Sequence, residues 1–409
     1  MAIKPELRLT DQQRFDWLRL VRSENVGPRT FRALVTNFGG ARAALNALPA
    51  LARRGGASRE IRVASIEEIE KELIAARKLG VRFIALGEPD YPSALREIDS
   101  APPILALRGQ AEGLRKAAVA IVGSRNASAA GLTFAERLAR GLGQAGYVIV
   151  SGLARGIDQR AHLASLETCA VGVLAGGHGK PYPGDAVPLM ERMVESGAIL
   201  SEMPIEWEPR GRDFPRRNRI VSGLALGVVV VEAARGSGSL ITARFALDQN
   251  RQVFAVPGSP LDPRAEGTND LLKQGASICT GPDDVLTALE PVRSSDLAAM
   301  REAGGEPGEP LWGEQALYGV DPESTPRTRP GDEFDDMSGS PYKTGDEASA
   351  ARERIVALLG PSPITLDELA RAAEAPARAV RVALLELELA GRVEYSGDRV
   401  ALRAPADQT

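Results

Sequence analysis

The middle of this 409-residue sequence consists of short apolar runs that alternate with segments of helical periodicity. The runs lack polar alternation, which predicts strands that are apolar on both faces, separated by helices such as those expected at 130–142 and 240–249. This pattern restricts the fold to an α/β class with an extended Rossmann-like, doubly wound, mostly parallel sheet covered on both sides. We expect its strands at 82–86, 104–107, 119–122, 147–150, 171–174, 198–200, 228–231, 253–256 and 277–279.

Residues 1–79 have a helical pattern and predict an N-terminal helical domain in front of the Rossmann-like domain at 80–290. Two short helices joined by the turn Asn25-Val-Gly-Pro-Arg-Thr30 would fit a SAM or helix-hairpin-helix fold. The amides of such a turn approach DNA phosphates in helix-hairpin-helix modules. Plain helix packing explains the same turn, so both interpretations stay open.

The sequence changes character again after residue 290. Residues 291–346 are rich in Gly, Pro, Ser and acidic side chains, which is typical of a disordered linker. Residues 347–405 then predict helices at 352–359, 366–373 and 377–389 and a hairpin at 392–402, the order of a winged-helix domain. Its third helix would read a DNA groove, but its charges are balanced, which favours protein contact or a structural role.

Composition excludes several classes of protein. The two cysteines, Cys169 and Cys279, lie in apolar runs and predict buried reduced thiols, not a disulfide framework or a zinc site. No apolar run approaches the roughly 18 residues of a membrane span, and the N-terminus lacks a signal-peptide pattern. We therefore expect a cytoplasmic protein.

Positive charge is concentrated locally in a chain whose net charge is −4. Five arginines stand against one acid between Pro209 and Ile220, and they are Arg210, Arg212, Arg216, Arg217 and Arg219. A guanidinium group matches phosphate oxygens with two parallel hydrogen bonds. The cluster therefore predicts a polyanion, with nucleic acid as the first candidate, although dispersed arginines are often only a solvated face.

Glycine and polar residues follow several strands at the edge where a parallel sheet binds ligands. Such segments begin at Gly123, Ser151, Ala175 and Glu232. Their amides and helix N-termini predict anion binding. None has the Gly-x-Gly-x-x-Gly spacing of a dinucleotide site, and Leu174 replaces the first glycine of a Walker A motif, so no cofactor is expected.

Catalytic and metal-binding patterns are sparse. The only histidines, His162 and His178, lack metal-ligand spacing, and no Gly-x-Ser-x-Gly elbow occurs. We expect His162 in the core and His178 in solvent. The alternative is a nucleotide hydrolase or phosphoribohydrolase on the same fold, with Glu202 or Glu232 as acid or base.

Six segments taken together resemble the DNA-processing protein A (DprA, also called Smf) family. They are Ala120-Ile-Val-Gly-Ser-Arg125, Ser151-Gly-Leu-Ala-Arg-Gly-Ile-Asp158, Tyr182-Pro183, Ser201-Glu-Met-Pro204, Phe214-Pro-Arg-Arg-Asn-Arg-Ile220 and Ser239-Leu-Ile-Thr-Ala-Arg244. The resemblance spans about residues 80–285. It implies a dimeric, non-enzymatic protein that binds single-stranded DNA, protects it during natural transformation and loads the recombinase RecA onto it.

The resemblance also implies the DNA-binding residues. Gly123, Ser124 and Arg125 match the family's glycine-serine-arginine loop, and Arg216, Arg217, Asn218 and Arg219 match its second basic segment. From the neighbouring strand ends and the arginine cluster we add Ser151, Gly152, Arg155, Arg212, Phe214, Ser239 and Thr242. The chain has His178-Gly-Lys180 where many relatives carry an acid, which puts the local charge of that loop in doubt.

Overall fold

A computed structural model describes residues 8–302, 346–397 and 399–403. The described residues form two compact units, one containing residues 67–302 and the other combining residues 10–66 with the described part of the C-terminal third. Each unit has hydrophobic clusters of its own. Among the described residues, no helix is both long and apolar enough to cross a membrane.

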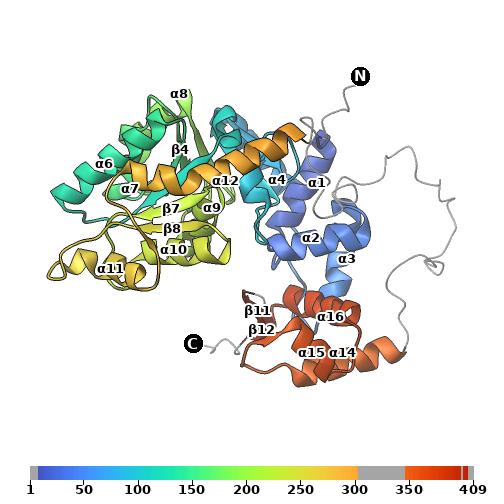
Figure 1. Cartoon of the computed structure of the whole chain (residues 1–409). Coiled ribbons are helices and arrows are strands. Elements are labelled where there is room, and N and C mark those ends of the chain that lie inside the picture. Colours follow the sequence, from blue (N-terminus) through green and yellow to red (C-terminus); the bar gives the residue numbers. More distant parts are fainter. Residues whose placement is uncertain (1–7, 303–345, 398, 404–409) are drawn as a thin grey trace. The chain divides into compact units, whose positions relative to one another are not determined.

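The first unit is built around a nine-stranded sheet, which confirms the expected class (Figure 1). Its strands are β1 (Val81–Ala85), β2 (Ile104–Gly109), β3 (Ala118–Val122), β4 (Val148–Ser151), β5 (Ala170–Val173), β6 (Ala198–Ser201), β7 (Gly227–Val230), β8 (Gln252–Ala255) and β9 (Ser277–Ile278). All nine predicted strands are therefore found. Strands β3 to β8 are almost wholly buried, as their unbroken apolar runs require.

The strands lie in the order β1-β2-β6-β5-β4-β3-β7-β8-β9. All pairs from β6 to β9 are parallel, whereas β1 pairs with β2 and β2 with β6 in antiparallel register. Consecutive strands extend the sheet from β3 toward β6, and the chain then returns to place β7 on the other side of β3. This reversal makes β3–β7 the point at which an open parallel sheet forms a ligand crevice.

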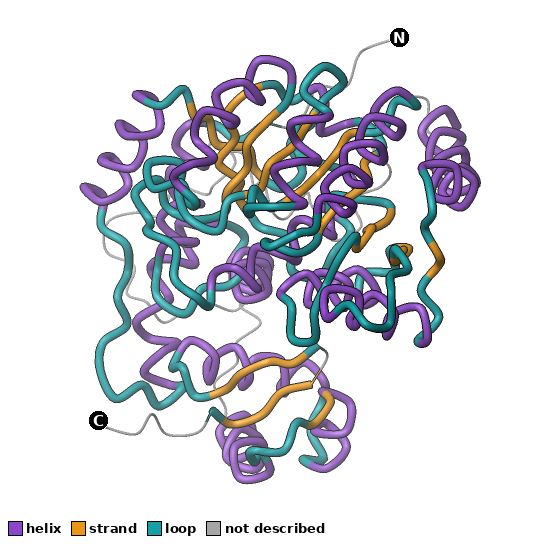
Figure 2. Tube along the Cα trace, turned by 90° about the vertical axis from the view of Figure 1, so that its left-hand side faces the viewer, coloured by secondary structure: helices purple, strands orange, loops and turns teal. Residues whose placement is uncertain are grey.

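Helices cover both faces of the sheet (Figure 2). They are α4 (Ile66–Lys78), α5 (Ser93–Arg96), α6 (Ala129–Gln144), α7 (Ile157–Ala164), α8 (Val187–Ser196), α9 (Asp213–Gly223), α10 (Gly238–Asp248), α11 (Glu266–Lys273) and α12 (Pro282–Glu302). One hydrophobic cluster packs α6, α7 and α12 against the central strands, with Tyr147 and Phe254 among its large buried side chains.

The segment that follows the boundary expected at residue 290 begins as a helix. Helix α12 continues through Pro291 to Glu302, so residues 291–302 are helical and not linker. Glu290 and Arg293 form an ion pair of 2.8 Å across this point, and the Arg293 guanidinium lies over the Tyr147 ring. These contacts tie the extension to the sheet unit; residues 303–345 of the expected linker lie outside the described residues.

The second unit joins a helical segment to a winged helix. Its N-terminal part contains α1 (Asp11–Arg22), α2 (Pro28–Phe38) and α3 (Ala41–Arg54), and its C-terminal part contains α14 (Asp346–Leu358), α15 (Leu366–Ala372) and α16 (Ala377–Leu389) with β10 (Ile364–Thr365), β11 (Val393–Ser396) and β12 (Arg399–Leu402). Strands β11 and β12 form the expected hairpin, and β10, which was not predicted, adds to it in the order β10-β12-β11. Capping boxes at Thr10 and Thr365 fix the starts of α1 and α15.

Candidate nucleic-acid interface

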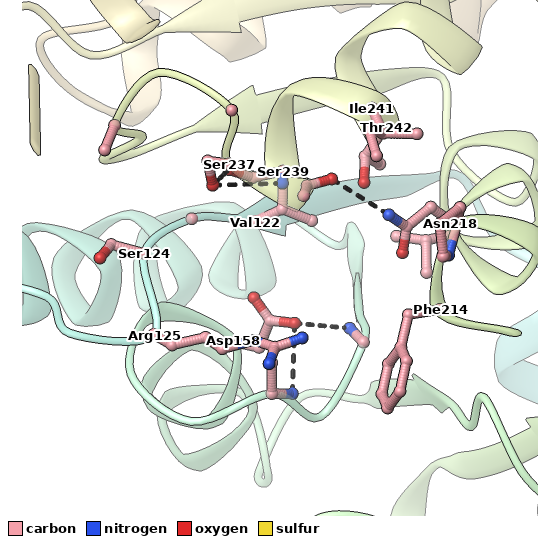
Figure 3. Close-up of a pocket in the computed structure, with 18 of the residues that line it drawn as sticks. Val122, Ser124, Arg125, Asp158, Phe214, Asn218, Ser237, Ser239, Ile241 and Thr242 are labelled. Carbon is pink, nitrogen blue, oxygen red and sulfur yellow. Dashed lines mark hydrogen bonds between the residues drawn. The ribbon is translucent and has the colours of Figure 1, made fainter. Parts of the chain in front are cut away.

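A pocket of about 380 Å³ lies at the switch point of the sheet (Figure 3). The loops after β3, β4 and β7 line it together with one face of α9 and the first turns of α10. Nine predicted site residues line this pocket, namely Gly123, Ser124, Arg125, Gly152, Phe214, Arg217, Asn218, Ser239 and Thr242. The topology therefore brings residues more than a hundred positions apart in the sequence into one concave site.

The loop after β3 presents its backbone and one cation to the pocket. A Cβ atom on Gly123 would lie 2.7 Å from Ile157 Cγ1, so the close approach of this loop to α7 requires glycine. The Arg125 guanidinium lies 5.5 Å from the centroid of the Phe214 ring. Tyr182, half exposed, meets the same ring edge-on at 5.4 Å. This arrangement places an arginine beside two aromatic rings, which are the kinds of side chain on which unpaired bases stack.

The opposite wall of the pocket is the N-terminus of α10. Ser237 caps this helix by accepting a hydrogen bond from the amide of Ser239, and the two hydroxyl groups lie 2.7 Å apart. Asn218 reaches across from α9 and donates to the carbonyl of Gly238 at 3.1 Å. The free amides of an eleven-residue helix attract anions at this end. The wall is thus chemically suited to a phosphate group.

Arg217 forms the floor of the pocket and is almost fully buried. Its Nη1 donates to the carbonyls of Gly152 and Val173, at the ends of β4 and β5. A Cβ atom on Gly152 would lie 2.6 Å from the guanidinium carbon, so glycine is needed for this contact. The buried Asp158 carboxylate accepts hydrogen bonds from the amides of Gly152 and Ala154. Arg217 therefore connects the ends of two strands at the pocket.

Burial shifts the acid–base properties of this floor. It lowers the pKa of Arg217 to about 10, and it raises the pKa of Asp158 although the charge of Arg217 opposes that change. His162 lies behind the floor, where burial lowers its pKa to about 3, so it is neutral at pH 7. His162 is a core residue, as expected.

The arginine cluster does not present five free cations, and this corrects the sequence-based picture. Glu202, which is buried, forms an ion pair of 3.0 Å with Arg216 and a second ion pair with Arg219. Arg219 is itself buried and also donates to the carbonyl of Ser100. Arg212 is exposed but does not line the pocket. Glu202 therefore neutralises the charges of Arg216 and Arg219 within the protein.

Two residues predicted after β4 also lie away from the pocket lining. Ser151 is fully buried, and its hydroxyl donates to the carbonyl of Ile121 in the neighbouring strand. Arg155 is exposed and pairs with Asp185 at 3.1 Å. Ser151 is a structural residue, because its hydroxyl is satisfied inside the sheet. A DNA contact of Arg155 stays a prediction.

The glycine loop after β5 is not a free anion site. The amides of Gly177 and Gly179 donate to the carbonyls of Trp207 and Ile205, so the loop is hydrogen-bonded to the segment before α9. His178 is buried and not in solvent as expected; its Nε2 lies 3.1 Å from the carbonyl oxygen of Ala106. Burial lowers the pKa of His178 to about 4, so this loop carries no histidine charge at neutral pH.

Sequence reasoning missed several pocket residues. Asp158 and Arg235 add charge to the lining, and Asn126, Gly236, Ser237 and Gly238 add backbone and hydroxyl groups. All six stand within the loops that follow β3, β4 and β7 or directly beside them. Their position after predicted strands was the available signal. Arg235 is three-quarters exposed and lies 3.6 Å from both Glu266 and Asp270.

The carboxylates of the alternative enzyme are engaged in structural contacts. Glu202 pairs with two arginines, and Glu232 accepts hydrogen bonds from the amide and the hydroxyl of Ser128 at the start of α6. Neither carboxylate lines the pocket. Within the described ranges, no group of three or more His, Cys, Asp or Glu side chains is arranged to hold a metal ion. Cys169 and Cys279 are buried free thiols, as predicted.

Family models match three parts of the chain in order. The model described as DNA recombination-mediator protein A matches residues 82–290, which is about half of the chain. A DprA-like N-terminal HHH domain matches residues 11–75, and a DprA winged helix domain matches residues 340–398. The chain belongs to the DNA-processing protein A family.

Individual relatives extend this assignment over most of the length. The putative DNA processing protein DprA of Mycobacterium tuberculosis is 33% identical over 374 residues, which cover 88% of this chain and 85% of that one. DNA processing protein DprA of Bacillus subtilis is 41% identical over 54% of this chain and 76% of its own. The X-ray structure of DprA from Streptococcus pneumoniae matches with a TM-score of 0.57 and 31% identity, and the match covers 69% of this chain and 98% of that one.

Proposed function

We propose that this chain is a cytoplasmic, homodimeric single-stranded-DNA-binding protein that protects incoming DNA and loads RecA in natural transformation and recombination. One observation carries the DNA-binding part, namely the pocket that combines Arg125, the ring of Phe214 and the N-terminus of α10. The mediator role in the description of the matching family supports the choice of RecA as partner. The proposal includes no catalytic residue.

The arrangement favours unpaired over paired DNA. Phosphates of the strand would meet the amides at the start of α10 and the guanidinium of Arg125, while bases would stack on Phe214 or Tyr182. A duplex hides the faces of its bases within the stack, so it cannot use the aromatic part of the site. No observation favours a nucleotide-cleaving enzyme, because the two candidate carboxylates are engaged elsewhere.

The test is Arg125→Ala in the full chain, measured with a labelled single strand and the matching duplex over a salt series. We expect single-strand affinity to fall about tenfold, and the dependence of log K on log salt to weaken by about 0.7, because one phosphate contact is lost. Arg192→Ala is the matched control, since Arg192 is an exposed arginine on α8 that does not line the pocket.

Unchanged affinity and unchanged salt dependence in Arg125→Ala would contradict the proposed site. Equal affinity of the native chain for the single strand and the duplex would contradict the proposed specificity. RecA loading has a separate readout, the rate at which RecA assembles on a single strand that this protein already coats. Turnover of mononucleotides by the native chain would support the enzyme alternative.

A further inference from the structure

The third helix of the winged-helix module has two buried faces. Residues Val380, Ala383, Leu384 and Leu387 belong to the hydrophobic cluster of the winged helix itself. Leu385 and Leu389, one turn apart, are also buried, although they are not part of that cluster. The face of α16 that points away from its own domain core is therefore covered.

Residues 10–66 of the same compact unit provide the cover. Helix α3 ends at Arg54, and the following Gly55 touches the backbone of α16. A Cβ atom on Gly55 would lie 1.9 Å from the carbonyl oxygen of Glu386 and 2.9 Å from the Cβ of Ala390. Because φ of Gly55 is −66°, any residue could adopt its backbone conformation. Close packing against α16 is thus the reason that a side chain does not fit at this position.

Polar contacts match across the same surface. Buried Glu386 pairs with Arg54 at 2.9 Å from one side, and Arg352 of α14 lies 3.6 Å away on the other. Asn25 donates to the carbonyl of Leu389 at 2.9 Å, and Arg29 donates to the carbonyl of Gly397 at 2.6 Å. The guanidinium of Arg29 also lies over the Tyr395 ring in the wing. Ion pairs and hydrogen bonds therefore join the α1–α3 segment to the winged helix at the same surface as the apolar contacts do.

These contacts occupy the turn that the sequence indicates for DNA phosphate contact and the helix that it indicates for duplex DNA. Asn25 and Arg29 flank the Val-Gly-Pro turn that would approach a phosphate in a helix-hairpin-helix module. Helix α16 is the element that would enter a major groove. A helix whose outer face is packed against protein cannot lie in a groove at the same time.

We propose that the winged-helix module is an intramolecular docking domain, with the α1–α3 segment of the same chain as the occupant of the outer face of α16. The docked arrangement excludes duplex DNA from α16 and from the turn at residues 25–30. This proposal does not depend on the single-strand site, which lies in the other unit. Failure of either proposal leaves the other standing.

Gly55→Ala in the full chain tests the docking, because it adds one methyl group where Glu386 leaves no room. Gly27→Ala is the matched control, since Gly27 lies in the same helical segment, has φ of −85° and has open space around its Cβ position. Hydroxyl-radical footprinting read by mass spectrometry measures the exposure of individual leucine side chains. Leu384 and Leu387 report whether the winged helix itself stays folded.

We expect oxidation of Leu385 and Leu389 to rise at least about threefold in Gly55→Ala and to stay at the native level in Gly27→Ala, with Leu384 and Leu387 protected in both. Arg54→Glu, a change at a partly exposed side chain, should produce the same selective rise through loss of the ion pair with Glu386. Oxidation of all four leucines in Gly55→Ala would show that the winged helix has unfolded in this variant. The footprint of Arg54→Glu would then be the test of the docking.

Three outcomes would overturn the proposal. The first is rapid oxidation of Leu389 in the native chain, and the second is an unchanged footprint in both variants. The third is native protection that disappears on dilution, because the cover would then come from a second copy of the chain. Duplex binding that appears in Gly55→Ala but not in Gly27→Ala would support the exclusion of DNA by docking.

Discussion

Arg217 illustrates how one guanidinium group can line a candidate site and still be structural. It lines the pocket floor, but its Nη1 donates to two backbone carbonyls, and it is the positive charge beside buried Asp158. Arg216 and Arg219 on the same helix are instead held by Glu202. Consecutive arginines on α9 thus point to different surroundings, because each residue turns by about 100° around a helix.

Arg217→Ala should destabilise the fold by about 3 kcal/mol, because it leaves two buried carbonyls and the Asp158 carboxylate without their cation. Urea unfolding of the full chain at pH 7 measures this loss. Arg212→Ala is the control, and we expect it to change stability by less than about 0.5 kcal/mol because Arg212 is exposed. Native stability combined with lost DNA binding in Arg217→Ala would show that the side chain acts on the ligand and not on the fold.

At the scale of elements, the pocket depends on where strands end and helices begin. The first turn of α10 forms one wall, with Ser237 as its N-cap. A negative charge at an N-cap stabilises a helix through the same amides that would attract a phosphate. A carboxylate at this N-cap should therefore weaken DNA binding without destabilising the helix.

Ser237→Asp tests whether DNA binding can be weakened here without loss of stability. Asp caps a helix as well as Ser, so the free energy of unfolding should stay within about 1 kcal/mol of the native value. Single-strand affinity should fall about tenfold at low salt and less at high salt, because the added carboxylate repels phosphate and salt screens it. Thr10→Asp makes the same kind of cap exchange at α1 in the other unit. If both variants bind DNA equally well, the α10 terminus is not part of the site.

The secondary-structure elements could be predicted from the sequence more fully than the direction of their pairing or the partners of their side chains. Every expected strand of the sheet exists because an unbroken apolar run has no other stable place than between two layers of helices. Apolar runs carry no information on direction, so the antiparallel pairing of β2 with β6 could not be foreseen. Ser151, Gly152 and Arg155 were predicted as site residues from their position after a strand, whereas Gly123, Ser124 and Arg125 were predicted from the resemblance to the family. The partners of Arg216 and Arg219 were not, because Glu202 lies on a separate strand end.

At the scale of the whole molecule, we expect the stability of the two units to respond differently to acid. Both histidines of the chain, His162 and His178, lie in the sheet unit, and burial lowers their pKa values to about 3 and about 4. Burial raises the pKa of Asp158 in the same unit, which contributes with the opposite sign. In the other unit, burial raises the pKa values of Glu386 and Glu388.

Calorimetry of the full chain at pH 6.5 and pH 5.0 should therefore show two unfolding transitions that move apart. Each histidine binds a proton only after unfolding in this window, so the sheet unit should lose up to about 1.4 kcal/mol per histidine and pH unit, less the opposing effect of Asp158. A carboxyl group whose folded-state pKa is raised favours the folded state as the pH falls, so the unit with Glu386 and Glu388 should lose less stability than the sheet unit. Glu24 and Glu368 in the same unit have lowered pKa values and act in the opposite direction. Replacing His162 with Gln should reduce the loss of stability of the sheet unit between pH 6.5 and pH 5.0. A parallel fall of both transitions would show that the buried histidines do not govern the acid sensitivity of the sheet unit.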